Sequence, residues 1–489
     1  MKLSSLIFND EYNSLYNANN IEIENVTTSL QNINSGTLFV FIKSIKFDIT
    51  KIIQCVLALK PAAVLCEEDL PISEVGIPVL KCKNARRLLA YIYARFYEIN
   101  FKKLHFVGIT GTNGKTTTAT MLSHILSHSG KKVGFIGTGK IIINGKLISD
   151  FDYSMTTPDP EYLYYAIKEM QLAECEYVIM EVSSHALYFD KTAPILFDIA
   201  LFTNLSAEHL DFHKSIDEYF EAKMKLFSRA KLGIFNTDDE YSQKAYMQAK
   251  CKKSCIGILK DADAMAREVC LSGLSSSEYI YREKSRLFKV NLKLGGAFNV
   301  YNSMMATAAA LNLGIEPEKI KDAFGTLDFI DGRLEIINDE ITVIIDYAHT
   351  EEAFRNLLKL VYSNKNIEQK LITVFGCGGE RDKTKRPKMA REAEKYSDLV
   401  IVTSDNSRQE SEIEIIKNIL SGFKSTEHRK VITSRKAAIE YAIAFADAGD
   451  TVAIIGKGHE RYNLDKNGTH RFDERVIIKN ALKKRKTDI

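Results

Sequence analysis

The sequence predicts an α/β protein of three domains: a central P-loop domain with a parallel sheet, a Rossmann-like C-terminal domain and a smaller N-terminal domain. Three observations support this prediction. Short apolar runs recur along the chain with helical patterns between them, which is typical of parallel sheets. One of these runs leads into a glycine-rich turn at residues 108–118. The length of 489 residues corresponds to about three domains at roughly 150 residues each.

The first region spans residues 1–102. Apolar runs predict short strands at residues 37–42 and 62–66, and a helical pattern at residues 85–97 closes the region. We therefore expect an N-terminal domain that ends just before the glycine-rich turn.

The second region, residues 103–331, begins with an apolar run that predicts a strand at residues 104–109. The glycine-rich turn follows it, and residues 119–129 have a helical pattern. Further strands are predicted at residues 132–136, 177–180, 199–202 and 232–235. Helical patterns between several of these runs indicate parallel strands joined by crossover helices.

The third region, residues 332–489, repeats this alternation. Strands are predicted at residues 341–345, 370–375, 399–403 and 451–455, and helices at 413–420 and 435–446. A doubly wound sheet is the expected result. Its ligand loops should follow the strands, where Cys377 to Gly379, Asp405 with Asn406, and Gly456 to Gly458 occur.

Composition excludes several classes of protein. The net charge of +3 is small for this length and argues against binding nucleic acid by bulk electrostatics. Eight cysteines lie without a regular framework, which favours a reducing compartment. No uncharged run approaches the ~20 residues that cross a bilayer. We expect a cytoplasmic monomer that binds neither nucleic acid nor membrane.

The glycine-rich turn has the pattern of a phosphate-binding loop. Backbone N–H groups there can point at phosphate oxygens, with the dipole of the following helix behind them. Lys115 would reach the β- and γ-phosphates, and Thr116 would hold Mg²⁺. Ile109 stands where the common pattern has glycine, so a turn without a ligand is the alternative. The expected nucleotide ligands are Gly111, Thr112, Asn113, Gly114, Lys115, Thr116 and Thr117.

Three more residue types suggest metal chemistry. Glu181 follows an apolar strand and could ligate Mg²⁺ beside the loop, although a surface or capping glutamate is the alternative. His209 and His213 are four apart and could share one helix face. Leu210 stands where a zinc metalloprotease needs glutamate, so one histidine at a second Mg²⁺ is favoured. Lys223 lies in an apolar helical stretch, where a lysine usually reaches the surface.

Residues 110–116 and 181–187, the His209 segment and the Ala222-Lys223 segment together resemble the Mur ligase family. These ATP-dependent ligases build the peptide of bacterial cell-wall precursors. The resemblance implies that Thr116 and Glu181 hold one Mg²⁺ and that His209 helps to hold a second. It also implies that Lys223 carries a CO₂-derived carbamate. Asn302 would contact adenine, and Arg333 and Asp346 would complete the ATP site.

The implied reaction activates a carboxylate, with Lys115, Lys223, Glu181 and His209 as the catalytic set. A substrate carboxylate attacks the γ-phosphorus of ATP and forms an acyl phosphate. An amine then attacks the acyl carbon, and phosphate leaves. Positioning and charge neutralisation supply most of the catalysis in such phosphoryl transfers.

The resemblance also implies the two other substrates. Thr156, Thr157, Ser184 and Lys191 would contact UDP-N-acetylmuramoyl-L-alanyl-D-glutamate. The run from Asp405 to Arg408 resembles the Asp-Asn-Pro-Arg signature of the diaminopimelate-adding members of the family. The guanidinium group of Arg408 could form two parallel hydrogen bonds with the distal carboxylate of meso-diaminopimelate. Lysine lacks this carboxylate. The expected amino-acid ligands are Arg381, Asp405, Asn406, Arg408, Gly456 and Glu460.

Three departures from the family pattern keep alternatives open. Residues 29–31 read Ser-Leu-Gln where the family has Asp-Ser-Arg near the uridine, Lys191 replaces an arginine, and Ser407 replaces proline. The alternatives are a lysine- or ornithine-adding relative, a paralogous amide ligase with another acceptor, and an enzyme like folylpolyglutamate synthetase. A nucleotide-binding regulatory module without turnover is the alternative outside enzymes.

Overall fold

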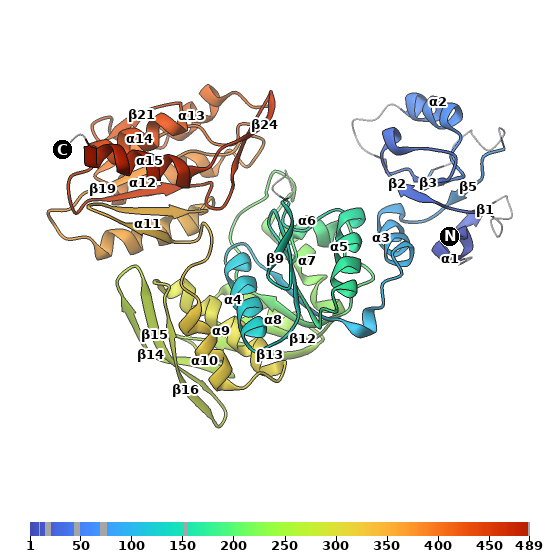
Figure 1. Cartoon of the computed structure of the whole chain (residues 1–489), viewed down its shortest axis with the longest axis horizontal. Coiled ribbons are helices and arrows are strands. Elements are labelled where there is room, and N and C mark those ends of the chain that lie inside the picture. Colours follow the sequence, from blue (N-terminus) through green and yellow to red (C-terminus); the bar gives the residue numbers. More distant parts are fainter. Residues whose placement is uncertain (9, 15–20, 44–48, 69–75, 151–154, 488–489) are drawn as a thin grey trace.

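A computed structural model describes the chain except residues 9, 15–20, 44–48, 69–75, 151–154 and 488–489. The predicted α/β architecture is confirmed. Three sheets follow one another along the chain, with the central sheet between the other two (Figure 1). No helix among the described residues is both long and apolar enough to cross a membrane.

The N-terminal sheet has the strand order β1-β5-β4-β3-β2 and is parallel except for β1. The predicted strands at 37–42 and 62–66 correspond to β3 and β4. Its strands are β1 (Asn13–Ser14), β2 (Asn25–Thr27), β3 (Thr37–Val40), β4 (Ala63–Cys66) and β5 (Val79–Lys81). Its helices are α1 (Leu3–Leu6), α2 (Ile49–Leu59) and α3 (Ala85–Phe96).

The central sheet has eleven strands in the order β16-β15-β14-β13-β12-β11-β6-β10-β7-β8-β9. Its middle, from β14 to β7, is parallel as predicted, because crossover helices connect most of these strands. The strands are β6 (His105–Thr110), β7 (Val133–Gly137), β8 (Lys140–Ile143), β9 (Lys146–Asp150), β10 (Tyr177–Glu181), β11 (Phe197–Phe202), β12 (Ala230–Asn236), β13 (Lys252–Gly257), β14 (Ala264–Ser272), β15 (Ser276–Glu283) and β16 (Arg286–Leu292).

Antiparallel hairpins extend both edges of this sheet, and the sequence analysis did not foresee them. β7, β8 and β9 form one extension, and β14, β15 and β16 form the other. Asn144 and Gly145 connect β8 to β9 with positive φ angles of 48° and 81°. Asn-Gly is a strong local signal for such a turn, so the sequence was sufficient to predict this hairpin.

Seven helices accompany the central sheet among the described residues. α4 and α9 pack side by side, and α9 is buried along most of its length because its residues are small or apolar. The helices are α4 (Lys115–His128), α5 (Pro160–Leu172), α6 (Ser184–Tyr188), α7 (Ile216–Met224), α8 (Glu240–Gln248), α9 (Ala297–Asn312) and α10 (Pro317–Thr326).

The C-terminal sheet has the order β17-β18-β22-β19-β20-β21, parallel except for β17. Its strands are β17 (Glu335–Asn338), β18 (Thr342–Asp346), β19 (Leu371–Phe375), β20 (Leu399–Val402), β21 (Arg429–Val431) and β22 (Thr451–Ile455). A separate hairpin joins β23 (Tyr462–Asp465) to β24 (Gly468–Arg471).

Helices cover both faces of the C-terminal sheet, which confirms the doubly wound prediction. Side chains of α11, α12 and α13 form the core on one face, and those of α14 and α15 form the core on the other. The helices are α11 (Glu351–Asn364), α12 (Lys385–Tyr396), α13 (Glu412–Leu420), α14 (Arg435–Phe445) and α15 (Glu474–Thr487).

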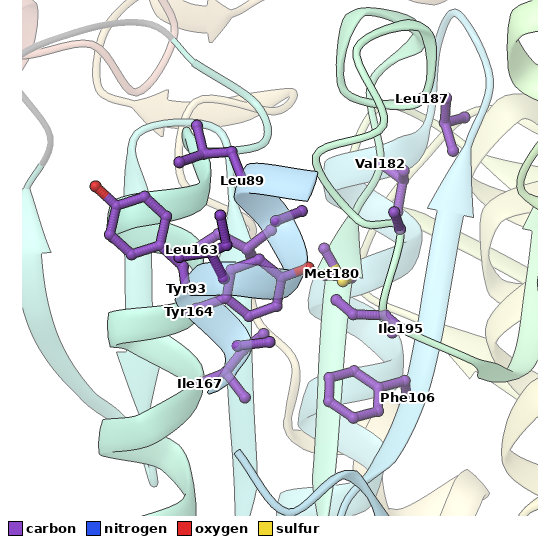
Figure 2. Close-up of a cluster of buried hydrophobic side chains, with 14 of the residues drawn as sticks. Leu89, Tyr93, Phe106, Leu163, Tyr164, Ile167, Met180, Val182, Leu187 and Ile195 are labelled. Carbon is purple, nitrogen blue, oxygen red and sulfur yellow. The ribbon is translucent and has the colours of Figure 1, made fainter. Parts of the chain in front are cut away.

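The N-terminal region is packed onto the central sheet through α3. Leu89 and Tyr93 of α3 lie beside Leu163 and Tyr164 of α5, and the cluster continues into the central strands (Figure 2). The Tyr93 hydroxyl donates to the Val26 carbonyl at 2.8 Å. One hydrophobic core therefore joins the first region to the second.

Candidate active site

A cavity of about 850 Å³ lies where the central and C-terminal regions meet. It is lined by the phosphate loop, the end of β10, α9, α11 and the loops after β19, β20 and β22. Most of the residues that the sequence singled out line this one cavity. The exceptions are Gly111, Thr157, Ser184, Lys191, His213 and Lys223.

The phosphate loop runs from Gly111 to Gly114, between β6 and α4. Gly111 has φ +144° and Gly114 has φ +84°. A Cβ atom would lie 1.9 Å from Thr203 Oγ1 at Gly111 and 2.4 Å from Asn302 Oδ1 at Gly114. Only glycine fits these two positions. α4 begins at Lys115, four residues before the predicted start, so its N-terminal N–H groups face the cavity end of the loop.

Two lysines donate to the same carbonyl of this loop. Lys115 Nζ and Lys223 Nζ each lie 2.9 Å from the Gly111 carbonyl oxygen. Burial, followed by the nearby Lys115 charge, holds the pKa of Lys223 well below its usual value. Burial also lowers the pKa of Lys115 to about 8. Lys223 is only 1% exposed, so the alternative of a lysine that reaches the surface does not hold.

Glu181 is fully buried at the end of β10 and is not a surface glutamate. Thr116 Oγ1 donates to Glu181 Oε2 at 2.9 Å, and Arg333 Nη2 donates to Thr116 Oγ1 at 3.1 Å. Thr138, which the sequence analysis missed, donates to Glu181 through its backbone N–H at 3.1 Å and through its hydroxyl at 3.3 Å. Its position in the Gly-Thr-Gly turn after β7 was the available signal.

The hydroxyl of Thr116 and the carboxylate of Glu181 are hard oxygen donors side by side, which suits Mg²⁺. Among the described residues, no three His, Cys, Asp or Glu side chains are already grouped as a metal site. Mg²⁺ characteristically keeps waters and phosphate oxygens as its remaining ligands. The residues present therefore fit a metal ion that arrives with a nucleotide.

The expected helix with His209 and His213 on one face is not present. The two residues lie in a turn, and His209 has φ +57°. His213 is buried and its Nε2 lies 3.0 Å from Ser184 Oγ, so it supports Ser184 instead of facing the cavity. Burial, then the neighbouring His185, lowers the pKa of His209 far below its usual value. A neutral imidazole at the cavity wall can ligate a metal.

Asn302 binds a side chain of α4, and Asp346 binds backbone N–H groups at the cavity. Asn302 Oδ1 accepts from Thr118 Oγ1 at 3.3 Å, behind Gly114. Asp346 accepts the N–H groups of Leu334 at 2.6 Å and Ala348 at 2.7 Å. The apolar part of the cavity wall was not found from the sequence, because its residues are dispersed along the chain. It includes Leu271, Phe298, Tyr301, Leu357 and Leu360.

The loops after β20 and β22 are linked through Asn406. Its Nδ2 donates to Glu460 Oε2 at 2.7 Å, and its Oδ1 accepts from Lys457 Nζ at 2.7 Å. Lys457 is fully buried and also lies 3.6 Å from Asp405 Oδ1. The sequence indicated this loop but no role for the lysine. Arg408, with φ +53°, donates to the Gly379 carbonyl at 2.9 Å.

The four residues expected at the UDP-linked substrate surround the end of β10. Thr157 Oγ1 donates to the Glu181 carbonyl at 2.9 Å and accepts the Ser183 N–H at 3.0 Å. Lys191 forms an ion pair with Asp159 at 2.7 Å. Thr156 alone among the four lines the cavity.

Contacts also cross the cavity from the C-terminal region. Thr350 Oγ1 donates to Asn113 Oδ1 at 3.1 Å, and Asn113 Nδ2 lies 3.4 Å from Glu352 Oε2. Lys385 pairs with Glu208, and neither residue was singled out from the sequence. The C-terminal region is therefore held directly against the phosphate loop.

Comparisons with known proteins agree with this arrangement. The profile of the Mur ligase middle domain matches residues 109–310, and that of the Mur ligase glutamate ligase domain matches residues 332–458. The chain is 37% identical over 488 residues to UDP-N-acetylmuramoyl-L-alanyl-D-glutamate–2,6-diaminopimelate ligase 1 of Clostridium acetobutylicum, with 99% of each chain covered. It is 38% identical over 491 residues to the corresponding ligase of Clostridioides difficile, covering 99% of this chain and 100% of that one.

Solved structures give the same result. A UDP-N-acetylmuramoyl-L-alanyl-D-glutamate–2,6-diaminopimelate ligase superimposes with a TM-score of 0.67 and 27% identity, covering 96% of each chain. A Mycobacterium tuberculosis folylpolyglutamate synthase has a TM-score of 0.63 and 17% identity, covering 75% of this chain and 92% of that one. The second likeness shows a shared fold alone.

Proposed function

The chain belongs to the Mur ligase family, and from this premise we propose that it joins meso-2,6-diaminopimelate to the D-glutamate of UDP-N-acetylmuramoyl-L-alanyl-D-glutamate with ATP. Relatives of this name are 35–39% identical over 95–99% of the chain. The product is a precursor of bacterial peptidoglycan.

One observation supports the proposal most. A single cavity of about 850 Å³ holds a phosphate loop on one wall and Arg381, Arg408 and Glu460 on the other. Ligand sites typically enclose about 300–1,000 Å³. A nucleotide on the first wall and a charged amino acid on the second would bring phosphate and amine to the same acceptor carboxylate.

The chain supplies positive potential for phosphoryl transfer. Lys115 and the N-terminus of α4 neutralise charge on the β- and γ-phosphates while the acceptor carboxylate attacks the γ-phosphorus. Thr116 and Glu181 would hold Mg²⁺, which neutralises further phosphate charge when bound. ADP leaves from the γ-phosphorus as the acyl phosphate forms. The amine then attacks the acyl carbon and loses a proton, and phosphate leaves.

Lys223 is assigned as a carbamate. Burial holds the pKa of Lys223 well below its usual value, which favours the neutral amine, the form that can attack CO₂. The nitrogen forms a bond to the carbon of CO₂, one C=O double bond becomes a single bond to a negatively charged oxygen, and the nitrogen releases a proton, which leaves a carboxylate-like group on the side chain. That group would attract Mg²⁺ where an ammonium would repel it. His209, whose pKa is lowered by burial, would help to bind the second Mg²⁺.

We assign the residues that bind the amino acid from the charges of their side chains. Arg381 and Arg408 would bind the distal carboxylate of diaminopimelate, and Glu460 would pair with its distal ammonium. Asp405, Asn406 and Gly456 complete this surface. Lysine and ornithine lack the distal carboxylate, so they would leave the two guanidinium groups without an anion.

We divide the chain into a UDP-substrate-binding domain at residues 1–102, an ATP-binding domain at 103–331 and an amino-acid-binding domain at 332–489. The ATP site would comprise the phosphate loop with Asn302, Arg333 and Asp346. Thr156, Thr157, Ser184 and Lys191 would face the acceptor peptide. A cytoplasmic monomer is proposed, since one chain supplies every residue named.

Phosphate release tests the function. Purified protein is assayed with ATP, Mg²⁺ and UDP-N-acetylmuramoyl-L-alanyl-D-glutamate, together with meso-diaminopimelate, L-lysine or L-ornithine. We expect release that depends on both acceptor and diaminopimelate. A preference for lysine or ornithine would overturn the amino-acid assignment, and no release with any pairing would overturn the ligase assignment.

A further inference from the structure

Arg386 is a fully buried arginine of α12 that does not line the cavity. Its Nη1 and Nη2 atoms each donate to one carboxylate oxygen of Glu410, both at 2.8 Å. Nη1 also donates to Asn418 Oδ1 at 3.1 Å, and Nη2 donates to the Gly378 carbonyl at 3.2 Å. Two parallel hydrogen bonds of this kind fix orientation as well as distance.

This ion pair joins the two loops that carry the proposed carboxylate-binding arginines. Arg386 donates to the Gly378 carbonyl in the loop that carries Arg381. It also donates to Glu410, which follows Arg408 in the other loop. Glu410 Oε2 also accepts the Glu380 N–H at 3.0 Å, which is a second link between the loops. The hydrogen bond from Arg386 lowers the pKa of Glu410 to about 2, so the pair is ionised at ordinary pH.

The loops are in close contact and locally strained. The Gly379 N–H donates to the Asn406 carbonyl at 2.9 Å, and a Cβ atom at Gly379 would lie 1.9 Å from the Ser407 carbonyl oxygen. Glu380 and Arg408 have φ angles of +52° and +53°. Non-glycine residues keep such angles only where the surroundings impose them. The Arg386–Glu410 ion pair, with Arg386 fully buried, is a charged contact between the segments that carry the two loops.

We propose that Arg386 and Glu410 form a positioning pair that sets the separation of Arg381 and Arg408, and thereby selects an amino acid with a carboxylate at its distal end. This inference rests on the proposed function. Neither residue of the pair lines the cavity. Lysine at position 386 would keep the charge but lose the planar fork, so the loops would no longer be held in one relative position.

The test compares Arg386→Lys with wild type in the phosphate-release assay. The readouts are KM for diaminopimelate, kcat, KM for ATP, the ratio of kcat/KM for diaminopimelate to that for lysine, and the thermal midpoint. We expect KM for diaminopimelate to rise about tenfold to a hundredfold, as for other small displacements of a binding group. We expect the selectivity ratio to fall and KM for ATP to stay unchanged.

A matched control is available in the N-terminal region, where Arg95 forms a two-bond fork with Glu11 at 2.6 and 2.9 Å. Arg95→Lys should lower the thermal midpoint and leave KM for diaminopimelate and the selectivity ratio unchanged. Glu410→Gln preserves the shape of its side chain and removes its charge. It should repeat the effects of Arg386→Lys, and it serves as the test if that variant does not fold.

Wild-type KM and selectivity in a folded Arg386→Lys or Glu410→Gln protein would overturn the inference. So would a fall in thermal midpoint alone, since that is the behaviour of an ordinary structural ion pair. If wild-type protein releases phosphate without a preference for diaminopimelate, the proposed substrate is wrong and this inference falls with it. Selective wild-type turnover with unselective variants supports both.

Discussion

Lys385 Nζ donates to Glu208 Oε1 at 2.9 Å and joins the C-terminal helix α12 to the segment that follows β11 of the central sheet. Lys385 is 9% exposed and Glu208 is 4% exposed. Glu208 Oε2 is buried without a hydrogen-bond partner among the described residues. Lys385 thus connects the C-terminal region to the central region across the cavity. The next residue of α12, Arg386, forms its hydrogen bonds within the C-terminal region.

Lys385→Met should open the cavity. It leaves the Glu208 carboxylate buried and unpaired, which is strongly unfavourable, and removes a contact that holds the two regions together. We expect kcat to fall about 10²-fold, as for displacements of about 1 Å in a reacting site. Phosphate release gives kcat, and small-angle scattering should show a larger radius of gyration. Lys388→Met, on the same helix in an exposed ion pair with Glu351, is the control. Equal behaviour of the two variants would rule out the role of Lys385.

Lys223→Ala should nearly abolish turnover. The variant loses the proposed carbamate, and removal of one electrostatic group at a reacting centre typically costs about 10²–10³-fold in rate. Added formate or acetate should restore part of the activity by replacing the carboxylate. Lys225→Ala, at the exposed end of the same helix, should retain activity. Full activity of Lys223→Ala would remove the carbamate from the mechanism.

ATP affinity should fall as pH rises above 8. The pKa of Lys115 is about 8 before nucleotide binds, and phosphate oxygens favour its charged form and raise that pKa. Binding above pH 8 therefore takes up a proton, with affinity decreasing by at most tenfold per pH unit. Titration calorimetry in buffers of different ionisation enthalpy measures this uptake. Lys115→Arg stays charged over this range, so its ATP binding should show no such uptake. Proton release above pH 8 in the wild type would contradict the prediction.

Arg408→Ala should mainly raise KM for diaminopimelate. Hydrogen bonds to a charged group contribute about 1.5–3 kcal/mol, which corresponds to roughly tenfold or more in KM. The value of kcat should change less, because the lost contact binds substrate at a distance from the reacting amine. Arg391→Ala, an exposed residue of α12, is the control. An unchanged KM for diaminopimelate would place Arg408 outside the amino-acid site.

Gly332→Ala should destabilise the junction between the central and C-terminal regions. Gly332 has φ +64° and a Cβ atom there would lie 2.1 Å from His459 N. The left-handed conformation alone costs about 1–2 kcal/mol for alanine, and the clash adds to this. Gly325→Ala in α10, where no atom lies within 4 Å of the new Cβ, should instead stabilise by about 0.5–1 kcal/mol. Urea unfolding distinguishes the two, and similar midpoints would refute the prediction.

Strand and helix positions were predictable where the pattern is local. The strand predicted at residues 451–455 has the same bounds as β22. The helix predicted at residues 413–420 corresponds to α13, which begins one residue earlier. The edge hairpins were missed because the strand predictions followed continuous apolar runs, whereas a strand such as β15 is buried only at alternate positions. His209 and His213 were misplaced because a four-residue spacing is compatible with a turn as well as a helix.

By itself, the sequence determined the phosphate loop, the carboxylate at the end of β10 and the loops that carry Asp405, Arg408 and Glu460. These features depend on residues within a few positions of one another, so spacing is enough to reveal them. Only the tertiary structure decided that Lys223 is buried against Gly111 and that Arg386 holds two loops together. The protonation and partners of such groups depend on burial by segments up to a hundred or more residues away, which spacing does not record.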